Sequence, residues 1–318
     1  MVRASAIPLS GYLSPEEAAV PASGASLKGK SVLITGGASG LGASVSLKYA
    51  ECGAYVTLAD INEKLGESYA KELQAKGLHV QFIATDVTSW TSQVAAFKAA
   101  IAFSPSNSAI DIVLAAAGVF GVPFLTADEP AVSLENDPPA PNMVAVEVNT
   151  IGSYYTAKLA QLYFALPGSP PNSDKSLILI SSLVAYFDIP LMSTYTASKF
   201  GVRGMFHSIR PMFADRGMRV NLIAPWIMET PLVTEWLKMF NAVGAPVGNT
   251  QDVITSAMRF ADDPKVNGRA FACGPKRILD LGDDIEGEDA GKVMHGFYET
   301  ELPGWDKMAA GLIGLMGI

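Results

Sequence analysis

Short apolar runs alternate with longer amphipathic segments along most of the chain. From residue 31 onward, runs rich in Val, Ile and Leu are separated by segments that repeat apolar residues every three or four positions. The first pattern favours buried strands, and the second predicts helices with one wet face. Strands are expected at 31–35, 54–59, 79–84, 110–115, 176–181, 219–223 and 269–273, and helices at 43–51, 62–76, 89–103, 143–166, 194–215, 230–242 and 250–261.

Nearly uninterrupted apolar strands joined by helices are typical of a parallel sheet that is covered on both faces. The sequence therefore predicts an α/β fold, a single Rossmann-like doubly wound domain with a seven-stranded parallel sheet and helices on both faces. This domain is expected at 29–275, and the proline-rich stretch at 119–142 is interpreted as a loop excursion within it. Residues 1–28 are expected to form an N-terminal arm, and 276–318 a C-terminal extension that packs on the domain or on a partner subunit.

Composition narrows the possible partners. The 318 residues carry 23 Lys and Arg against 31 Asp and Glu, and no long basic run, so nucleic-acid binding has little support. The apolar tail at 308–318 is about half as long as a membrane span requires. It is expected to pack on the domain or a partner, with a membrane-surface contact or a substrate lid as alternatives. Two distant cysteines and three scattered histidines indicate neither a disulfide scaffold nor a metal site, and a reducing, cytoplasmic location fits.

The stretch KSVLITGGASGLG at 30–42 reads as a strand, a glycine turn and a helix. Glycines in such a unit let the backbone approach a diphosphate, and the N–H groups at the helix start supply donors. A glycine-rich turn alone also fits an ordinary tight turn. Asp60 follows the second strand and is placed to accept hydrogen bonds from an adenosine ribose, while its charge would repel the 2′-phosphate of NADP. It therefore predicts NAD as the preferred cofactor, although an Asp here can also serve as a helix N-cap.

Ser182, Tyr195 and Lys199 form the strongest candidate for a catalytic site. Tyr195 and Lys199 are four residues apart in YTASK on a predicted helix, so their side chains share one face. An ammonium beside a phenol favours the phenolate, and the pKa of Tyr195 is expected to fall from about 10 towards the working pH, as a general base requires. Ser182 follows a strand and is placed to hydrogen-bond a substrate oxygen. It lacks the GxSxG neighbours of a hydrolase nucleophile.

Taken together, these motifs resemble the short-chain dehydrogenase/reductase family over roughly residues 28–275. The resemblance rests on TGGASGLG at 35–42, Asp86, Asn149 in VNTIG, and the three residues Ser182, Tyr195 and Lys199. It implies that Tyr195 is the acid/base, that Ser182 orients the substrate oxygen, and that Lys199 tunes Tyr195 and holds the nicotinamide ribose. Asn149 would hold a water that passes the proton to solvent.

The resemblance also implies a cofactor site and an assembly. The residues expected to bind the cofactor are Gly36, Ser39, Gly40, Leu41, Gly42, Asp60, Asp86, Val87, Ala116, Gly118, Tyr195, Lys199, Pro225, Met228 and Thr230. The helices at 143–166 and 194–215 match those through which the family pairs its subunits, so a homodimer or homotetramer is expected.

Two departures from the family pattern concern the edges of this site. Ala115-Ala116-Ala117-Gly118 replaces the usual Asn-Asn-Ala-Gly, so side-chain hydrogen bonds that brace the sheet are expected to be missing. Trp226 replaces a glycine and either turns outward or joins the substrate pocket. A pocket formed by Leu183, Tyr186, Trp226, Trp236, Met239 and Phe240 would be apolar and aromatic, although such residues are also common in cores and subunit contacts.

The leading hypothesis is an NAD-dependent oxidoreductase that interconverts a secondary alcohol and a ketone on a bulky hydrophobic or aromatic small molecule. The loops and Trp226 are similar to those of short-chain enzymes in fungal secondary metabolism and of hydroxyprostaglandin dehydrogenases. Two alternatives remain open at this point. One is a lyase or isomerase that uses Tyr195 without net redox change, and the other is a cofactor-binding sensor without turnover.

Overall fold

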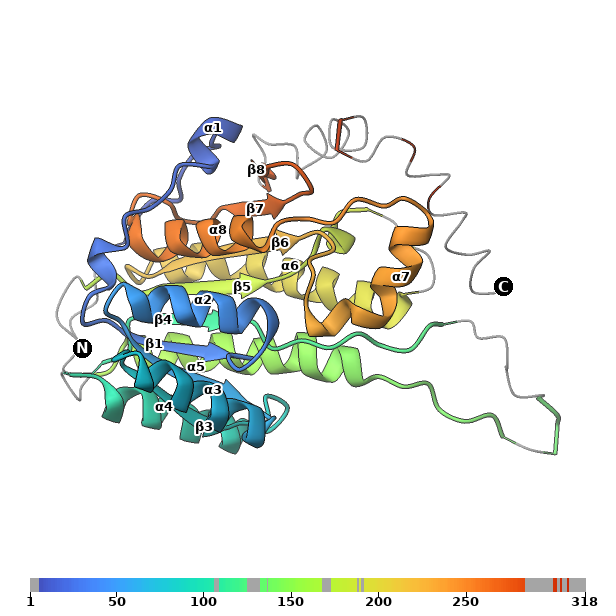
Figure 1. Ribbon diagram of the computed structural model, residues 1–318, viewed down its shortest axis with the longest axis horizontal. Coiled ribbons are helices and arrows are strands. Elements are labelled where there is room, and N and C mark those ends of the chain that lie inside the picture. The colour runs from blue at the N-terminus through green and yellow to red at the C-terminus, as the bar shows by residue number, and fades with distance from the viewer. Residues whose placement is uncertain are drawn as a thin grey trace.

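An eight-stranded sheet organises the described chain, which comprises residues 6–105, 109–124, 132–135, 137–167, 173–187, 189, 192–283, 300, 301, 304 and 308 of this computed structural model (Figure 1). Its strands lie in the order β3-β2-β1-β4-β5-β6-β7-β8. They are β1 (Ser31–Thr35), β2 (Tyr55–Asp60), β3 (Val80–Ala84), β4 (Ile112–Ala115), β5 (Ser176–Ile180), β6 (Arg219–Pro225), β7 (Ala270–Cys273) and β8 (Ile278–Asp280). The predicted Rossmann-like α/β fold is confirmed.

The strand count differs from the prediction of seven parallel strands. The first seven strands pair in parallel, but β8 adds an antiparallel edge strand to β7. It lies within the segment that was expected to be a C-terminal extension. With only three residues, β8 is too short to show the hydrophobic periodicity by which strands are predicted.

Helices cover both faces of the sheet, as expected. Contacts place α2, α3 and α8 on one face and α4, α5 and α6 on the other. The helices are α1 (Pro15–Ala18), α2 (Gly40–Glu51), α3 (Glu63–Ala75), α4 (Trp90–Phe103), α5 (Ser153–Phe164), α6 (Ser193–Ala214), α7 (Thr234–Ala242) and α8 (Thr250–Asp262). Four short turns add η1 (Ala25–Leu27), η2 (Val146–Gly152), η3 (Leu183–Ala185) and η4 (Pro231–Val233), of which η2 is π-helical.

The central strands are buried along their whole length. Every residue of β1, β4, β5 and β6 is buried, because helices pack on both sides of them. Burying a Val, Leu or Ile side chain contributes about 1.5–3 kcal/mol, so this layer is the main source of stability. Apart from Asn221 in β6, the polar side chains of these four strands lie at the strand ends, where the site is expected.

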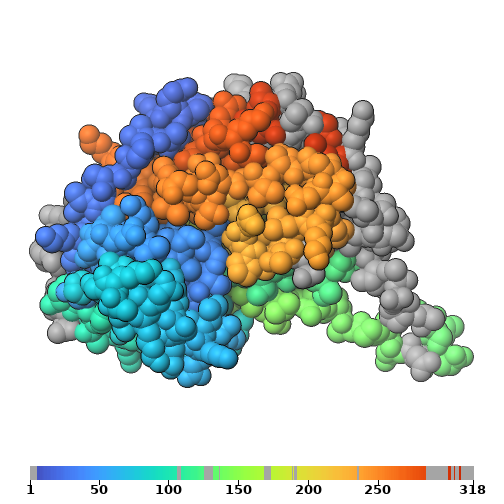
Figure 2. Space-filling model, in the orientation of Figure 1, coloured from blue at the N-terminus to red at the C-terminus, as the bar shows by residue number. Residues whose placement is uncertain are grey.

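The described part of the N-terminal arm lies along the β7–β8 edge of the sheet (Figure 2). The backbone N–H of Ser10 donates to the Asn267 carbonyl at 2.8 Å, and that of Leu13 donates to Asp280 Oδ2 at 2.9 Å. Asp280 in turn is paired with Arg269 at 2.8 Å. The arm and the antiparallel strand are therefore joined through one buried carboxylate.

Two further observations bear on partners and metals. Among the described helices, none combines the length and the apolar character needed to cross a bilayer. The described residues also contain no cluster of three or more His, Cys, Asp or Glu side chains with metal-binding geometry.

Candidate active site

A cavity of about 410 Å³ opens at the carboxyl ends of the parallel strands. It lies where the strand order reverses between β1 and β4, which is the position at which open α/β sheets bind ligands. All fifteen residues that the family resemblance assigns to the cofactor line this cavity. The wall therefore gathers residues from the ends of six strands, β1 to β6, that are far apart in the sequence.

The glycine loop after β1 leaves room for a diphosphate. Gly36 has a φ of +66°, and a Cβ there would lie 2.7 Å from the Ala117 Cα atom. A Cβ at Gly42 would collide with the Gly36 carbonyl oxygen. Helix α2 begins at Gly40, and the Ser39 side chain makes no capping hydrogen bond to its first turn. The uncapped N–H groups and the absence of side chains fit the diphosphate of a nicotinamide cofactor.

Asp60 reaches the cavity from the end of β2. Its Oδ2 accepts a hydrogen bond from the Ala38 N–H at 3.1 Å, and its Oδ1 accepts one from the Asn62 N–H at 3.0 Å. The N-cap of α3 is Asn62, so the alternative role considered for Asp60 belongs to its neighbour. A carboxylate offers about four acceptor sites, and Asp60 retains capacity for ribose hydroxyls.

Ser182, Tyr195 and Lys199 meet in the cavity wall. Ser182 follows β5, where its Oγ donates to the Pro225 carbonyl and accepts from the Val184 N–H, each at 3.3 Å. Tyr195 and Lys199 lie one turn apart near the start of α6, and both are buried. Lys199 Nζ donates to the Ile180 carbonyl at 3.1 Å and lies 5.6 Å from the Tyr195 ring centroid. The three residues form one constellation, contributed by β5 and α6.

The titration of Tyr195 and Lys199 differs from the sequence-based expectation. Burial raises the pKa of Tyr195 to about 12, although a hydrogen bond with Ser182 opposes this shift. Burial lowers the pKa of Lys199 to about 8. The pKa of Tyr195 is therefore shifted in the direction opposite to the prediction that Lys199 lowers it, because desolvation of the buried phenol is the largest contribution to the shift.

Asn149 lies in the π-helical turn η2 and does not line the cavity. Its Nδ2 donates to the Val119 carbonyl and to Ser198 Oγ, each at 2.9 Å, and its Oδ1 accepts from the Val119 N–H at 2.8 Å. The side chain thus fastens the segment after β4 to α6. Together with Thr35 Oγ1, which accepts from the Ala117 N–H at 3.3 Å, it braces the region where the usual asparagines are missing.

Trp226 and Phe240 line the substrate end of the cavity. Trp226 is 6% exposed, its Nε1 donates to the Pro246 carbonyl at 2.8 Å, and its ring packs on Phe187 with centroids 5.5 Å apart. Of the two orientations considered for this residue, the outward one is therefore wrong. The indole is held by its own hydrogen bond and presents apolar surface to the cavity.

The other four residues predicted for the substrate pocket do not line it. Leu183 is fully buried in the core, and Met239 packs against that core from outside. Tyr186 turns away and donates its hydroxyl to Asp283. Trp236 packs behind Phe120, a residue of the wall, with ring centroids 5.8 Å apart. Their spacing indicated a shared surface, but the turn η3 and the face of α7 direct them elsewhere.

Sequence reasoning missed several apolar residues of the wall. The nearest is Phe120, whose ring centroid lies 4.4 Å from that of Tyr195. Its position two residues after Gly118, beyond the end of β4, was the available signal. The other missed apolar residues of the substrate end are Val144, Val148, Val184, Ile189, Met192, Leu232 and Val233.

Comparison with known proteins identifies the family. A sequence profile described as short chain dehydrogenase matches residues 30–240, more than half of the chain. The chain belongs to the short-chain dehydrogenase family. This short-chain dehydrogenase is 44% identical over 285 residues to a 5′-hydroxyaverantin dehydrogenase of Dothistroma septosporum, with 85% of this chain and 92% of that protein covered.

Two further relatives and a solved structure extend the comparison. A 5′-hydroxyaverantin dehydrogenase of Emericella nidulans is 42% identical, with 82% of this chain and 89% of that protein covered. An NADP-dependent dehydrogenase of a Phoma species is 30% identical, with coverage of 87% and 86%. A 3-ketoacyl-(acyl-carrier-protein) reductase from Brucella melitensis complexed with NADH has the same fold, with a TM-score of 0.66 at 23% identity over 79% of this chain and 99% of that one. This short-chain dehydrogenase is an oxidoreductase that acts on CH–OH groups with a nicotinamide cofactor.

Proposed function

We propose that this short-chain dehydrogenase is an NAD-dependent oxidoreductase that interconverts a secondary alcohol and a ketone on a bulky hydrophobic or aromatic small molecule. The observation that carries the proposal is the position of Ser182, Tyr195 and Lys199 between two unlike parts of one cavity. A glycine cradle lies on one side of them, and an apolar wall with Phe120 and Trp226 lies on the other.

The residues divide the chemistry as follows. Bound nicotinamide supplies the acceptor or donor of the hydride. Tyr195 Oη takes the hydroxyl proton during oxidation and returns it during reduction, while Ser182 Oγ holds the same substrate oxygen by a hydrogen bond. Lys199 Nζ binds the nicotinamide ribose and, when charged, stabilises the Tyr195 phenolate. The water that passes the proton to solvent would be held at the acceptor site that remains on Asn149 Oδ1, since both Nδ2 protons are donated to Val119 and Ser198.

Asp60 favours NAD over NADP in this proposal. Its carboxylate lies at the adenosine end of the cavity and is held by two backbone N–H groups, so it is oriented to accept from ribose hydroxyls and to repel a 2′-phosphate. Two relatives are named as NADP-dependent, so the preference needs a direct measurement. Asp60→Ala is expected to raise activity with NADP at least tenfold relative to NAD, since a loss of about 1.4 kcal/mol of discrimination corresponds to a factor of ten. Equal use of both cofactors by the wild type would contradict the assignment.

The apolar wall supports a bulky substrate. Phe120, Trp226 and Phe240 supply aromatic surface, while the described part of the wall near Tyr195 offers Ser182 as a hydrogen-bonding side chain for a substrate. The 44% and 42% identical relatives are both named for a hydroxylated compound, 5′-hydroxyaverantin. A place in secondary metabolism fits these relatives and is included in the proposal.

Apolar residues exposed on two helices support a homodimer or homotetramer. Tyr154 and Leu162 on α5 are 56% and 45% exposed, and Phe200 and Met212 on α6 are 44% and 52% exposed. These helices are the ones through which the family resemblance predicts pairing. Burial of such surface by a second subunit would remove it from water.

Absorbance at 340 nm tests the activity. We expect NADH to form when the protein is mixed with NAD and aromatic secondary alcohols such as 1-tetralol or 1-acenaphthenol. Tyr195→Phe should lower turnover by about 10²–10⁴-fold, the usual contribution of an acid/base, and leave the Kd for NADH nearly unchanged. Turnover that survives this substitution would refute the mechanism. Product without a change in NADH would instead indicate the lyase or isomerase alternative.

A further inference from the structure

A buried charged cluster lies directly behind the turn that follows Ser182. Its centre is Asp283, which follows β8 and is only 1% exposed in its side chain. Tyr186 Oη donates to Asp283 Oδ2 at 2.7 Å, and Arg203 donates to Oδ1 through Nη2 at 2.7 Å and through Nε at 3.2 Å. His207 Nε2 lies 2.9 Å from the same Oδ1. None of these side chains has a part in the chemistry proposed above.

The cluster continues the catalytic face of α6. Tyr195, Lys199, Arg203 and His207 follow one another at intervals of four residues, so their side chains project from one side of the helix. The first two lie in the cavity wall, and the next two meet Asp283. A displacement of this face would move both groups together.

Arg203 also holds the turn η3, which begins immediately after Ser182. Its Nη1 donates to the Ala185 carbonyl at 3.2 Å, and its guanidinium carbon lies 4.1 Å from the Tyr186 ring centroid. The turn is therefore fixed at three points, by a carbonyl, a ring face and a phenol hydroxyl. Because Ser182 Oγ caps the same turn through the Val184 N–H, the position of the serine depends on how η3 is held.

The electrostatics of the cluster favour a single arrangement. Burial alone would raise the pKa of Asp283, but contacts with His207, Arg203 and Tyr186 lower it well below its ordinary value. Burial and the Asp283 charge raise the pKa of Tyr186, which therefore remains a donor. A buried ion pair adds little stability compared with an apolar replacement, so geometry is the property that such a cluster supplies.

We propose that Tyr186, Arg203 and Asp283 are positioning residues that fix the distance between Ser182 Oγ and Tyr195 Oη. They join η3, α6 and residues 281–283 after β8 at one point, and so make these three residues a support of the active site. The inference rests on the proposed function, which assigns the reacting contacts to Ser182 and Tyr195. A misplacement of about 1 Å in such a pair can lower a rate by about 100-fold.

Tyr186→Phe, with Tyr49→Phe as a matched control, tests the proposal. Both substitutions remove a tyrosine hydroxyl with a 2.7 Å hydrogen bond, which is buried at Tyr49 and partly buried at Tyr186. Tyr49 donates to the Ala257 carbonyl and does not line the cavity. We expect Tyr186→Phe to lower kcat for 1-tetralol by about 10- to 100-fold with the KM for NAD within twofold, and Tyr49→Phe to lower Tm without changing kcat. Equal kcat in the two variants would overturn the proposal.

Two more variants separate charge from shape. Asp283→Asn keeps the side-chain volume and removes the charge, and it should lower kcat as Tyr186→Phe does. Arg203→Lys keeps the positive charge but should still lower kcat relative to wild type. One ammonium cannot reproduce the planar guanidinium that binds both Asp283 and the Ala185 carbonyl. Full activity in either variant would contradict the positioning role.

Hydrogen exchange separates this inference from the proposed function. If wild type leaves the alcohols unchanged, or if Tyr195→Phe remains active, the proposed function fails. Amide exchange at residues 183–186 still decides whether the cluster holds η3. We expect it to be about tenfold faster in Tyr186→Phe than in wild type and unchanged in Tyr49→Phe. Unchanged exchange in Tyr186→Phe would refute the inference by itself.

Discussion

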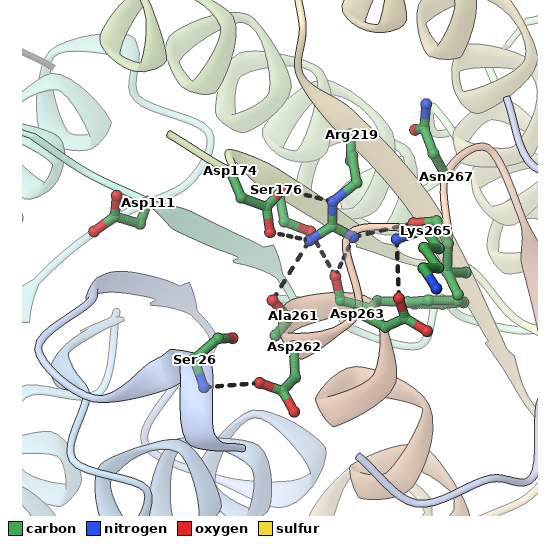
Figure 3. Close-up of polar contacts among 12 residues, drawn as sticks. Ser26, Asp111, Asp174, Ser176, Arg219, Ala261, Asp262, Asp263, Lys265 and Asn267 are labelled. Carbon is green, nitrogen blue, oxygen red and sulfur yellow. Dashed lines mark hydrogen bonds and ion pairs between the residues drawn. The ribbon is translucent and has the colours of Figure 1, made fainter. Parts of the chain in front are cut away.

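The two ends of the parallel sheet bury positive charge in opposite ways. At the amino end, Arg219 is 1% exposed and donates to both carboxylate oxygens of Asp174 at 2.7 Å, and to the Phe260 and Val266 carbonyls at 2.6 and 3.0 Å (Figure 3). Lys175 donates to Asp111 at 2.9 Å. At this end Arg219 and Lys175 are both buried, and each meets a carboxylate.

At the carboxyl end, Lys199 is 4% exposed and has no carboxylate partner among the described residues. Its ammonium donates to a single backbone carbonyl. Burial lowers the pKa of both Lys175 and Lys199, but Asp111 opposes the shift of Lys175 and nothing opposes that of Lys199. The charges of Lys175 and Arg219 are thus paired with carboxylates at the amino end of the sheet, whereas Lys199 lies unpaired with any carboxylate of the described residues in the cavity wall.

Lys199→Met, at the carboxyl end of the sheet, is expected to have the largest effect. Removing the ammonium deletes its contacts with the ribose and with the Tyr195 phenolate, so kcat/KM should fall by about 1,000-fold, or about 4 kcal/mol. The free energy of unfolding should rise by about 1–2 kcal/mol, because an uncompensated buried charge is replaced by a side chain of similar volume. Steady-state kinetics and urea denaturation measure the two effects. Loss of activity accompanied by a lower free energy of unfolding would contradict the claim that Lys199 is an uncompensated buried charge.

Arg219→Met should have the reverse pattern. The substitution removes both bonds to Asp174 and one of the two donors to each of the Phe260 and Val266 carbonyls, which keep Ser176 Oγ and Asn221 Nδ2. Because a bidentate ion pair with one buried partner is broken, the free energy of unfolding should fall by about 3 kcal/mol. The value of kcat per folded molecule should stay within twofold of wild type, because Arg219 lies at the opposite end of the sheet from the cavity. A large change in kcat would show that the two ends are coupled.

The parts of this site that sequence could predict are local in the chain. Short spacings identify the glycine loop and the pair Tyr195 and Lys199, and Asp60 is identified because it directly follows a strand. The structure brings these residues together around one cavity, although their roles remain proposals.

The parts that sequence could not predict depend on side-chain direction or on distant contacts. Phe120 resembles any core phenylalanine in a hydrophobic pattern, and Tyr186 points to Asp283 rather than into the pocket because of the turn η3. Arg203 and Asp283 are 80 residues apart in sequence. No periodicity links them, and the strand β8 that brings Asp283 into place is three residues long.

The lowered pKa of Lys199 predicts that the free energy of unfolding depends on pH. The pKa of Lys199 is about 8 in the folded protein and about 10.4 when unfolded, so the unfolded state binds more protons between these values. The destabilisation of the folded state by the buried Lys199 charge is therefore complete below about pH 8 and is relieved as pH rises towards about 10.4. Wild type should therefore gain about 2 kcal/mol relative to Lys199→Met between about pH 7.5 and 9.5. Denaturation without cofactor measures this gain, and a constant difference would contradict the charged, unpaired state.

Asp174→Asn should have the smallest effect. Asp174 is 33% exposed, so water can replace part of its interaction with Arg219, and an Asn oxygen can still accept one hydrogen bond. Arg219 also retains its bonds to the Phe260 and Val266 carbonyls. The free energy of unfolding should fall by about 1 kcal/mol, clearly less than in Arg219→Met. Glu67→Gln is the control, because its ion pair with Lys71 lies on the surface of α3 and should contribute nothing measurable. Equal losses in Asp174→Asn and Arg219→Met would show that the ion pair with Asp174, and not the Arg219 bonds to the Phe260 and Val266 carbonyls, stabilises the amino end of the sheet.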